Sequence, residues 1–160
     1  MRSLDQPMPH NILRPDTRKH LIDRIQQLQP NAEGRWGKMN AHEMLVHCCD
    51  AARMATGHRP VPFRGNLLGR TVIKWGILLR GKFPNVSVRA PRAIRREGDG
   101  SDLGEFEADR EQLIHLVESF PEMPFAIQKP THNVFGPMSR REWGRLGYIH
   151  TDHHLRQFGV

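Results

Sequence analysis

The sequence predicts an all-α bundle formed by a single domain. Three observations support this fold class: five segments repeat apolar residues at helical spacing, two of them begin with a capping-box pattern, and none shows a convincing strand pattern. With 160 residues, the chain is long enough to bury a core as one domain, which we expect to span residues 1–160. The sequence contains no internal repeat and no low-complexity tract.

The first two predicted helices lie in the N-terminal third of the chain. Apolar residues recur at helical spacing over residues 16–28, with polar residues between them. The second helix begins at Asn40, a good N-cap, and Glu43 stands at the position that completes a capping box. This helix runs as far as Gly57, and its small residues favour close packing against neighbouring helices.

The middle of the chain is less regular. Residues 67–79 predict a third helix. Because Gly69 and Gly76 interrupt it, the sequence does not fix the residues at which this helix begins and ends. Residues 66–79 are too few and too charged to span a bilayer, so no membrane partner is expected. Residues 81–104 are rich in Pro, Gly and Arg, and they predict a long irregular loop between the third and fourth helical segments.

Two further helices complete the predicted bundle. The fourth helical segment covers residues 105–120, and the proline that follows ends it. The last helix begins at Ser139, with Glu142 at its capping-box position, and continues almost to Val160. A short alternation over residues 86–88 does not suffice to predict a sheet.

Composition and charge exclude several classes of protein. The N-terminus lacks the apolar core of a secretory signal, and adjacent Cys48 and Cys49 would form a strained disulfide, so we expect a reducing, cytoplasmic location. The net charge is +7, but the basic residues are scattered and their one local cluster has no interleaved aromatic residues, which disfavours a nucleic-acid partner. That cluster consists of Arg89, Arg92, Arg95 and Arg96.

Histidines of the last predicted helix form the most informative pattern. His150 and His154 are four residues apart, which places both imidazoles on one face, and the helical projection turns that face toward the core. A divalent cation would satisfy both buried rings at once, whereas hydrogen-bonded core histidines are the alternative. His47, on the flank of the second helix, is the best candidate for a third ligand.

Other polar residues offer secondary roles. Asp152, Glu43 and Asp50 are candidates for orienting a ligand ring, with solvated helix carboxylates as the alternative. The cysteine pair suggests a sensor of oxidants or soft metals, but Cys48 falls in the apolar stripe, which favours a small buried hydrophobic residue instead. Cys49 is the more exposed of the two in the same projection. Among the remaining histidines, we single out His132 because it precedes the last helix; the others are expected at the surface or in loops. Those others are His10, His20, His42, His58 and His115.

Three stretches resemble a known family. The run His150-Thr-Asp-His153-His154-Leu-Arg-Gln157 is similar to the terminal helix of the DinB-like (DNA-damage-inducible) superfamily, which reads His-x-x-His-His-x-x-Gln. The stretch Met39-Asn-Ala-His-Glu-Met-Leu-Val-His47 resembles the early histidine helix of that superfamily. Residues 135–143 look like a subgroup still described as a domain of unknown function.

The resemblance implies an up-down-down-up four-helix bundle that holds zinc or nickel through His47, His150 and His154. Some members of the superfamily are transferases or isomerases that depend on bacillithiol, mycothiol or glutathione, so we expect a metal-dependent transferase or hydrolase that uses such a thiol. The catalytic residues, the small-molecule substrate and a homodimeric state are left open. Two alternatives are a non-catalytic protein with a structural metal, which binds a ligand or partner, and the sensor of thiols or metals.

Overall fold

The computed structural model describes residues 10–84, 98, 100–123 and 131–160, and most of these residues are helical. The expected basic cluster and the alternation over residues 86–88 lie outside the described residues. The α-helices are α1 (Pro15–Gln27), α2 (Ala41–Ala55), α3 (Lys74–Arg80), α4 (Phe106–Ser119) and α5 (Arg140–Gln157). A π-helical turn over Gly69–Ile73 runs directly into α3. The five helical segments predicted from the sequence are thus confirmed.

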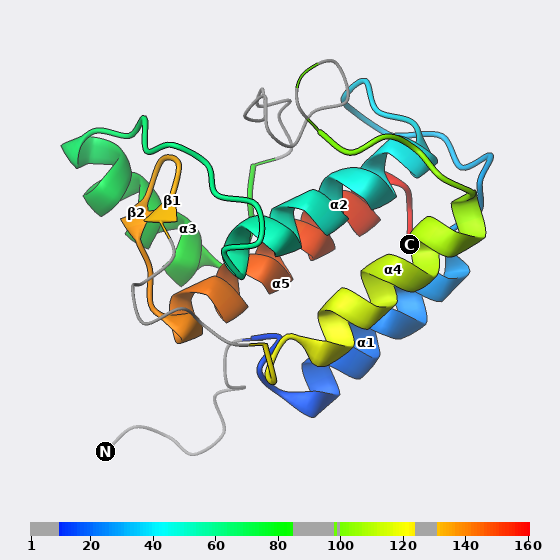
Figure 1. Ribbon diagram of the computed structural model, residues 1–160, viewed down its shortest axis with the longest axis horizontal. Helices are drawn as coiled ribbons and strands as arrows, with labels where there is room; N and C mark the ends of the chain where they lie inside the picture. Colours follow the sequence, from blue (N-terminus) through cyan, green and yellow to red (C-terminus); the bar gives the residue numbers. More distant parts are fainter. Residues whose placement is uncertain (1–9, 85–97, 99, 124–130) are drawn as a thin grey trace.

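Four of the helices share one core. α2 packs against α4 and α5, and α1 packs against the same two helices, whereas α3 lies to one side and contacts α5 (Figure 1). Apolar side chains from all four helices are fully buried between them, as expected for amphipathic helices that turn one stripe inward. These include Leu21, Ile25, Met44, Leu45, Leu113, Ile149 and Leu155. The metal-ligand candidates therefore lie on two neighbouring helices of this core.

Both predicted capping boxes are formed. The Glu43 backbone N–H donates to Asn40 Oδ1 over 2.9 Å, and the Asn40 backbone N–H donates to Glu43 Oε2 over 3.0 Å. Ser139 and Glu142 make the equivalent pair at the start of α5, over 2.7 and 3.3 Å. Each box satisfies backbone donors that the first turn of a helix leaves without partners. The sequence thereby sets the starts, and so the registers, of the two helices that carry the histidines.

The prediction that the chain contains no strand is wrong at one place. β1 (Thr131–His132) pairs antiparallel with β2 (Gly136–Pro137). His132 Nδ1 accepts hydrogen bonds from the backbone of Val134 and Phe135, so a side chain helps to hold the turn. Strands of two residues are too short to show an alternating pattern, which is why sequence periodicity misses them.

The long apolar segment predicted as the third helix is attached to the outside of the bundle. Arg145 of α5 donates to the backbone oxygen of Leu78, and Lys74 forms an ion pair with Glu142. Gly81, with φ of 75°, ends α3 in the left-handed conformation that glycine adopts without strain. In the described part of the chain, no helix is both long enough and apolar enough to traverse a bilayer.

Candidate metal centre

Three imidazoles converge between α2 and α5. His47 projects from α2, while His150 and His154 project from successive turns of α5. The Nε2 atoms of His47 and His150 lie 3.1 Å apart, and the three rings have centroid separations of 4.7–5.0 Å. One potential ligand atom from each ring lies within 4.8 Å of the other two. The structure therefore brings together the three histidines that the sequence suggested.

The surroundings of His150 and His154 keep these two rings of the cluster neutral. His47 and His154 are buried and His150 is half-buried. Burial lowers the pKa of His154 to about 3, with a further contribution from His47, and it lowers the pKa of His150 well below its usual range, together with the other histidines. A neutral imidazole offers a lone pair, which is the form that binds a metal ion.

Gln157 fixes the orientation of one of these rings. Its Nε2 donates to the backbone oxygen of Trp36, so its Oε1 remains to accept a hydrogen bond from His154 Nδ1 over 2.8 Å. Because Nδ1 of His154 carries the proton in this arrangement, Nε2 holds the lone pair. Such a partner on the non-ligating nitrogen is typical of metal-binding histidines. Gln157 stands in the motif of the last helix, but no role was predicted for it from the sequence. The signal that could have identified it is its spacing of three residues from His154.

Aromatic side chains border the cluster. The Phe83 ring meets the rings of His150 and His153 edge-on, with centroids 6.3 and 5.7 Å apart, and Trp36 lies 5.5 Å from the His153 ring. His153 Nδ1 and Trp36 Nε1 are buried and find no hydrogen-bond partner in the described part of the chain. His153 packs beside the cluster but is not one of the three converging ligands.

The donor set fits a divalent cation with an open coordination sphere. Across residues 10–84, 98, 100–123 and 131–160, no fourth His, Cys, Asp or Glu joins the group. Three neutral imidazoles leave the +2 charge of a cation uncompensated, and three protein ligands are typical of catalytic rather than structural zinc sites. Imidazole is an equally good ligand for zinc, nickel, copper and iron, so the donor set does not choose the metal.

The three carboxylates considered as orienting groups point elsewhere. Asp152 forms ion pairs with Arg24 of α1 and with Arg156. Glu43 completes the α2 capping box, and Asp50 forms ion pairs with Arg53 and Arg59 in a separate cluster. The structure therefore gives each of them a role in the scaffold and gives the orienting role to Gln157.

Both cysteines are buried, so the expectation that Cys49 faces solvent is wrong. The Cys49 thiol lies 3.8 Å from the backbone oxygen of Asp109, because α4 covers a face of α2 that the helical projection alone leaves open. Burial raises the pKa of Cys49 to about 12 and that of Cys48 well above its usual range. Thiolates are the reactive form of cysteine, so neither thiol is suited to sensing.

His132 stays outside the cluster. Its ring stacks on Phe135 at 4.3 Å and lies 5.5 Å from Trp143. Burial lowers its pKa to about 4, and its Nδ1 is already engaged by the hairpin backbone. The histidine that the sequence analysis singled out is therefore a structural element of the β-hairpin.

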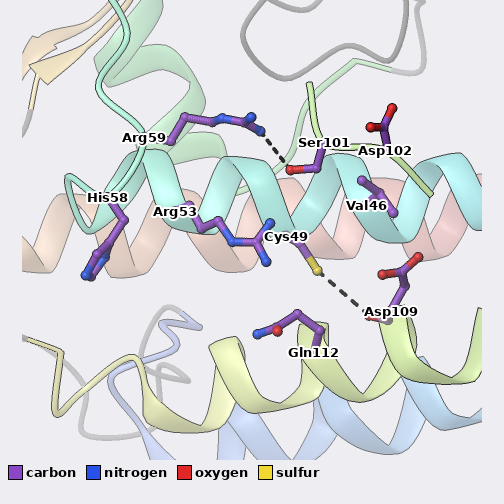
Figure 2. A pocket seen from close by; sticks show the side chains of 9 residues that line it. All are labelled: Val46, Cys49, Arg53, His58, Arg59, Ser101, Asp102, Asp109 and Gln112. Atoms are coloured by element: carbon purple, nitrogen blue, oxygen red, sulfur yellow. Dashed lines mark hydrogen bonds between the residues drawn. The ribbon is translucent and has the colours of Figure 1, made fainter. Parts of the chain in front are cut away.

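A polar pocket of about 350 Å³ lies on another face of α2. Figure 2 shows the side chains that line it, contributed by α2, the residues that follow it, the segment before α4, and α4 itself. Asp50, which is buried, binds three of the lining residues: Arg53 over 3.1 Å, Arg59, and Ser101 through both its hydroxyl and its backbone N–H over 2.7 and 2.8 Å. The two lining arginines are thus held by an internal carboxylate, and this Asp50 cluster joins residue 101 to α2.

Comparison with known proteins identifies the family of the chain. The sequence model of a family described as a protein of unknown function (DUF1569) matches residues 9–159, which is nearly the whole chain. Neither a curated protein nor a solved structure matches it.

Proposed function

We propose that this chain, which belongs to the DUF1569 family, is a metal-dependent enzyme related to the DinB-like superfamily. The reaction class we favour is transfer or hydrolysis on a small electrophilic substrate, with a low-molecular-weight thiol as the second reactant. One observation carries the proposal: three imidazoles from two helices converge with ligand atoms within 4.8 Å of one another. The lowered pKa values of His150 and His154 keep the lone pairs of these two rings available at neutral pH.

The roles of the residues follow from their positions. His47, His150 and His154 would hold zinc or nickel, and Gln157 would keep the His154 ring in the required tautomer and orientation. The cation, when bound, would act as a Lewis acid that lowers the pKa of a bound water or thiol. Phe83 and Trp36 border the cluster with aromatic surface and would limit the access of bulk water.

Enzymatic use is favoured over the two alternatives by separate observations. A structural zinc site is closed by four protein ligands, whereas only three converge in the described part of the chain. A thiol sensor needs an accessible thiolate, whereas burial raises the pKa of both Cys48 and Cys49. The chemistry is therefore assigned to the histidine cluster and not to the cysteines.

The same relationship implies a more specific architecture. We propose that α1, α2, α4 and α5 form an up-down-down-up four-helix bundle, with α3 as an addition outside it. The mutual packing of these four helices and the presence of all three histidines on α2 and α5 support this topology. We also propose a cytoplasmic location, which agrees with two free, buried cysteines.

Metal content and thiol binding test the proposal. We expect the purified protein to hold about one zinc or nickel ion per chain by elemental analysis, and the His150→Ala variant to lose it. His115→Ala, which changes an exposed histidine of α4, is the matched control and should keep the metal. Calorimetric titration of the loaded protein with glutathione, bacillithiol and mycothiol should detect at least one of them. Equal metal content in both variants would contradict the metal centre, and no heat with any thiol would remove the thiol reactant.

A further inference from the structure

The exposed apolar surface of the described chain is concentrated in one segment. Seven large hydrophobic side chains are exposed, and all of them lie between residues 63 and 79. They are Phe63, Leu67, Leu68, Val72, Ile73, Trp75 and Leu79. We call residues 63–82 the outer segment. Apolar residues gathered at one exposed place mark an interaction surface, whereas scattered ones do not.

Spacing within the outer segment shows that this surface is organised. Four of its residues follow one another at intervals of four, three and four positions, which is the pattern of a buried helix face. Here the stripe faces solvent instead, with Leu68 55%, Val72 66%, Trp75 50% and Leu79 78% exposed. The opposite side of the segment is anchored to α5 through Leu78 and Lys74. A helix fixed on one side and apolar on the other presents a stripe for a partner.

All charged residues of the outer segment are basic. Residues 63–82 contain Arg64, Arg70, Lys74, Arg80 and Lys82 but no acidic residue. The wider stretch of residues 51–96 contains eleven Lys and Arg residues and no Asp or Glu. One exposed cation lies over an aromatic ring of the same surface: Arg70 is 5.9 Å from the Phe63 ring centroid. Lys74, by contrast, is buried in its ion pair with Glu142. Apolar and cationic groups are therefore interleaved.

We propose that the outer segment docks the protein onto the surface of an anionic lipid bilayer. Leucine, valine and tryptophan side chains enter the boundary between headgroups and acyl chains, while flanking arginines and lysines pair with lipid phosphates. No membrane partner was predicted from the sequence, because this stretch is too short to span a bilayer. An interfacial helix lies in the plane of the membrane, so that length limit does not apply to it.

The observed chemistry disfavours other occupants. In a two-fold dimer through this surface, the exposed arginines of one copy would face those of the other, and residues 63–82 supply no carboxylate to compensate them. Nucleic acid is disfavoured because the exposed stripe is mostly aliphatic, and stacking on bases requires aromatic faces or guanidinium planes. The proposal is independent of the metal centre, because none of its residues is a ligand.

Vesicle binding by the full chain tests the proposal. We expect co-sedimentation with vesicles of phosphatidylglycerol and phosphatidylcholine, weak binding to pure phosphatidylcholine, and a decrease with added salt. The double variant Val72→Asp/Leu79→Asp should lower the partition coefficient at least about tenfold, because it places two charges in the apolar stripe. The matched control Gln26→Asp/His115→Asp changes the net charge equally on exposed positions of α1 and α4 and should remain within about threefold of the unchanged protein.

A second measurement locates the contact. Lipids brominated on the acyl chains should quench the fluorescence of the bound protein, and Trp75→Phe should remove most of the quenching while vesicle binding persists. Of the other two tryptophans, Trp143 is buried and Trp36 is half-buried against His153. The proposal is overturned if the unchanged protein stays in the supernatant with anionic vesicles. It is also overturned if both double variants bind equally well, or if the protein is a dimer that Val72→Asp/Leu79→Asp dissociates and shows no affinity for lipid.

Discussion

Helix α2 contributes to two polar clusters through His47 and Asp50, which are only three positions apart in the sequence. His47 faces α5 and meets two more imidazoles, whereas Asp50 binds Arg53, Arg59 and Ser101 around the pocket of Figure 2. The Asp50 cluster combines opposite charges, so its buried carboxylate is compensated within the chain. The histidine cluster combines groups of the same kind, whose lone pairs can be shared only with a proton or a cation.

This difference in charge composition indicates the role of each cluster. A buried charge with partners of opposite sign joins segments of the fold, and removing one partner is costly because the other stays uncompensated. Burial lowers the pKa of His150 and of His154, so the lone pairs of these two rings are available to a divalent ion, which His47 can also bind. We therefore expect changes at Asp50 to affect stability and changes at the histidines to affect metal binding.

The largest expected effect concerns stability. Asp50→Ala should lower the free energy of unfolding by about 3–5 kcal/mol, because it leaves two arginines without their buried carboxylate. Urea denaturation monitored by circular dichroism measures this change. Asp23→Ala, which removes an exposed ion pair with Lys19 on α1, is the control and should cost less than about 1 kcal/mol. Equal losses for the two variants would contradict the structural role of the Asp50 cluster.

The second effect concerns metal affinity. His47→Ala should weaken zinc or nickel binding more than about 100-fold, since losing a ligand exceeds the usual cost of losing a residue that orients one. Competition with a chromogenic chelator measures the affinity. Asp50→Asn, tested at a temperature at which it is folded, should bind the metal within about threefold of the unchanged protein, because Asp50 belongs to the other cluster. Similar losses in both variants would show that the clusters act as one unit.

The third effect is a pH dependence of the metal-free protein. The pKa of His154 falls from 6.5 to about 3 on folding, so between these values the unfolded chain binds more protons than the folded protein. The contribution of the neutral His154 ring to the free energy of unfolding is therefore fully present above pH 6.5 and is lost as the pH falls. Between pH 7 and pH 5, His154 alone lowers the free energy of unfolding by about 2 kcal/mol. Urea titrations of chelator-treated protein at the two pH values measure the loss. His154→Leu should show a smaller loss, and an unchanged slope in that variant would contradict the buried neutral ring.

The smallest effect separates orientation from ligation. Gln157→Ala should weaken metal binding by about tenfold, because the His154 ring loses the acceptor that fixes its tautomer. Gln157→Glu keeps an acceptor at that position and should restore most of the affinity, although it cannot donate to the Trp36 backbone oxygen. The same chelator competition distinguishes the two variants. If both lose affinity equally, the contact with Trp36 matters more than the orientation of the ring.

Local patterns of the sequence account for most of the secondary structure. Both capping boxes form, and the five predicted helical segments are present, because hydrogen bonds within a few residues determine them. The β-hairpin was missed because its strands are too short for periodicity and its turn depends on the side chain of His132. The exposure of Cys49 was misjudged because α4, which is distant in the sequence, covers that face of α2.

By itself, the sequence determined which helices form and which face of α5 carries His150 and His154, because helical periodicity depends on local spacing alone. Tertiary structure decided three further points: that His47 reaches this pair, that Gln157 and not a carboxylate orients it, and that the apolar stripe from Leu68 to Leu79 faces away from the core. The physical reason is that contacts between segments far apart in the chain depend on how helices pack, and an apolar stripe has the same spacing whether it faces a core or an external partner.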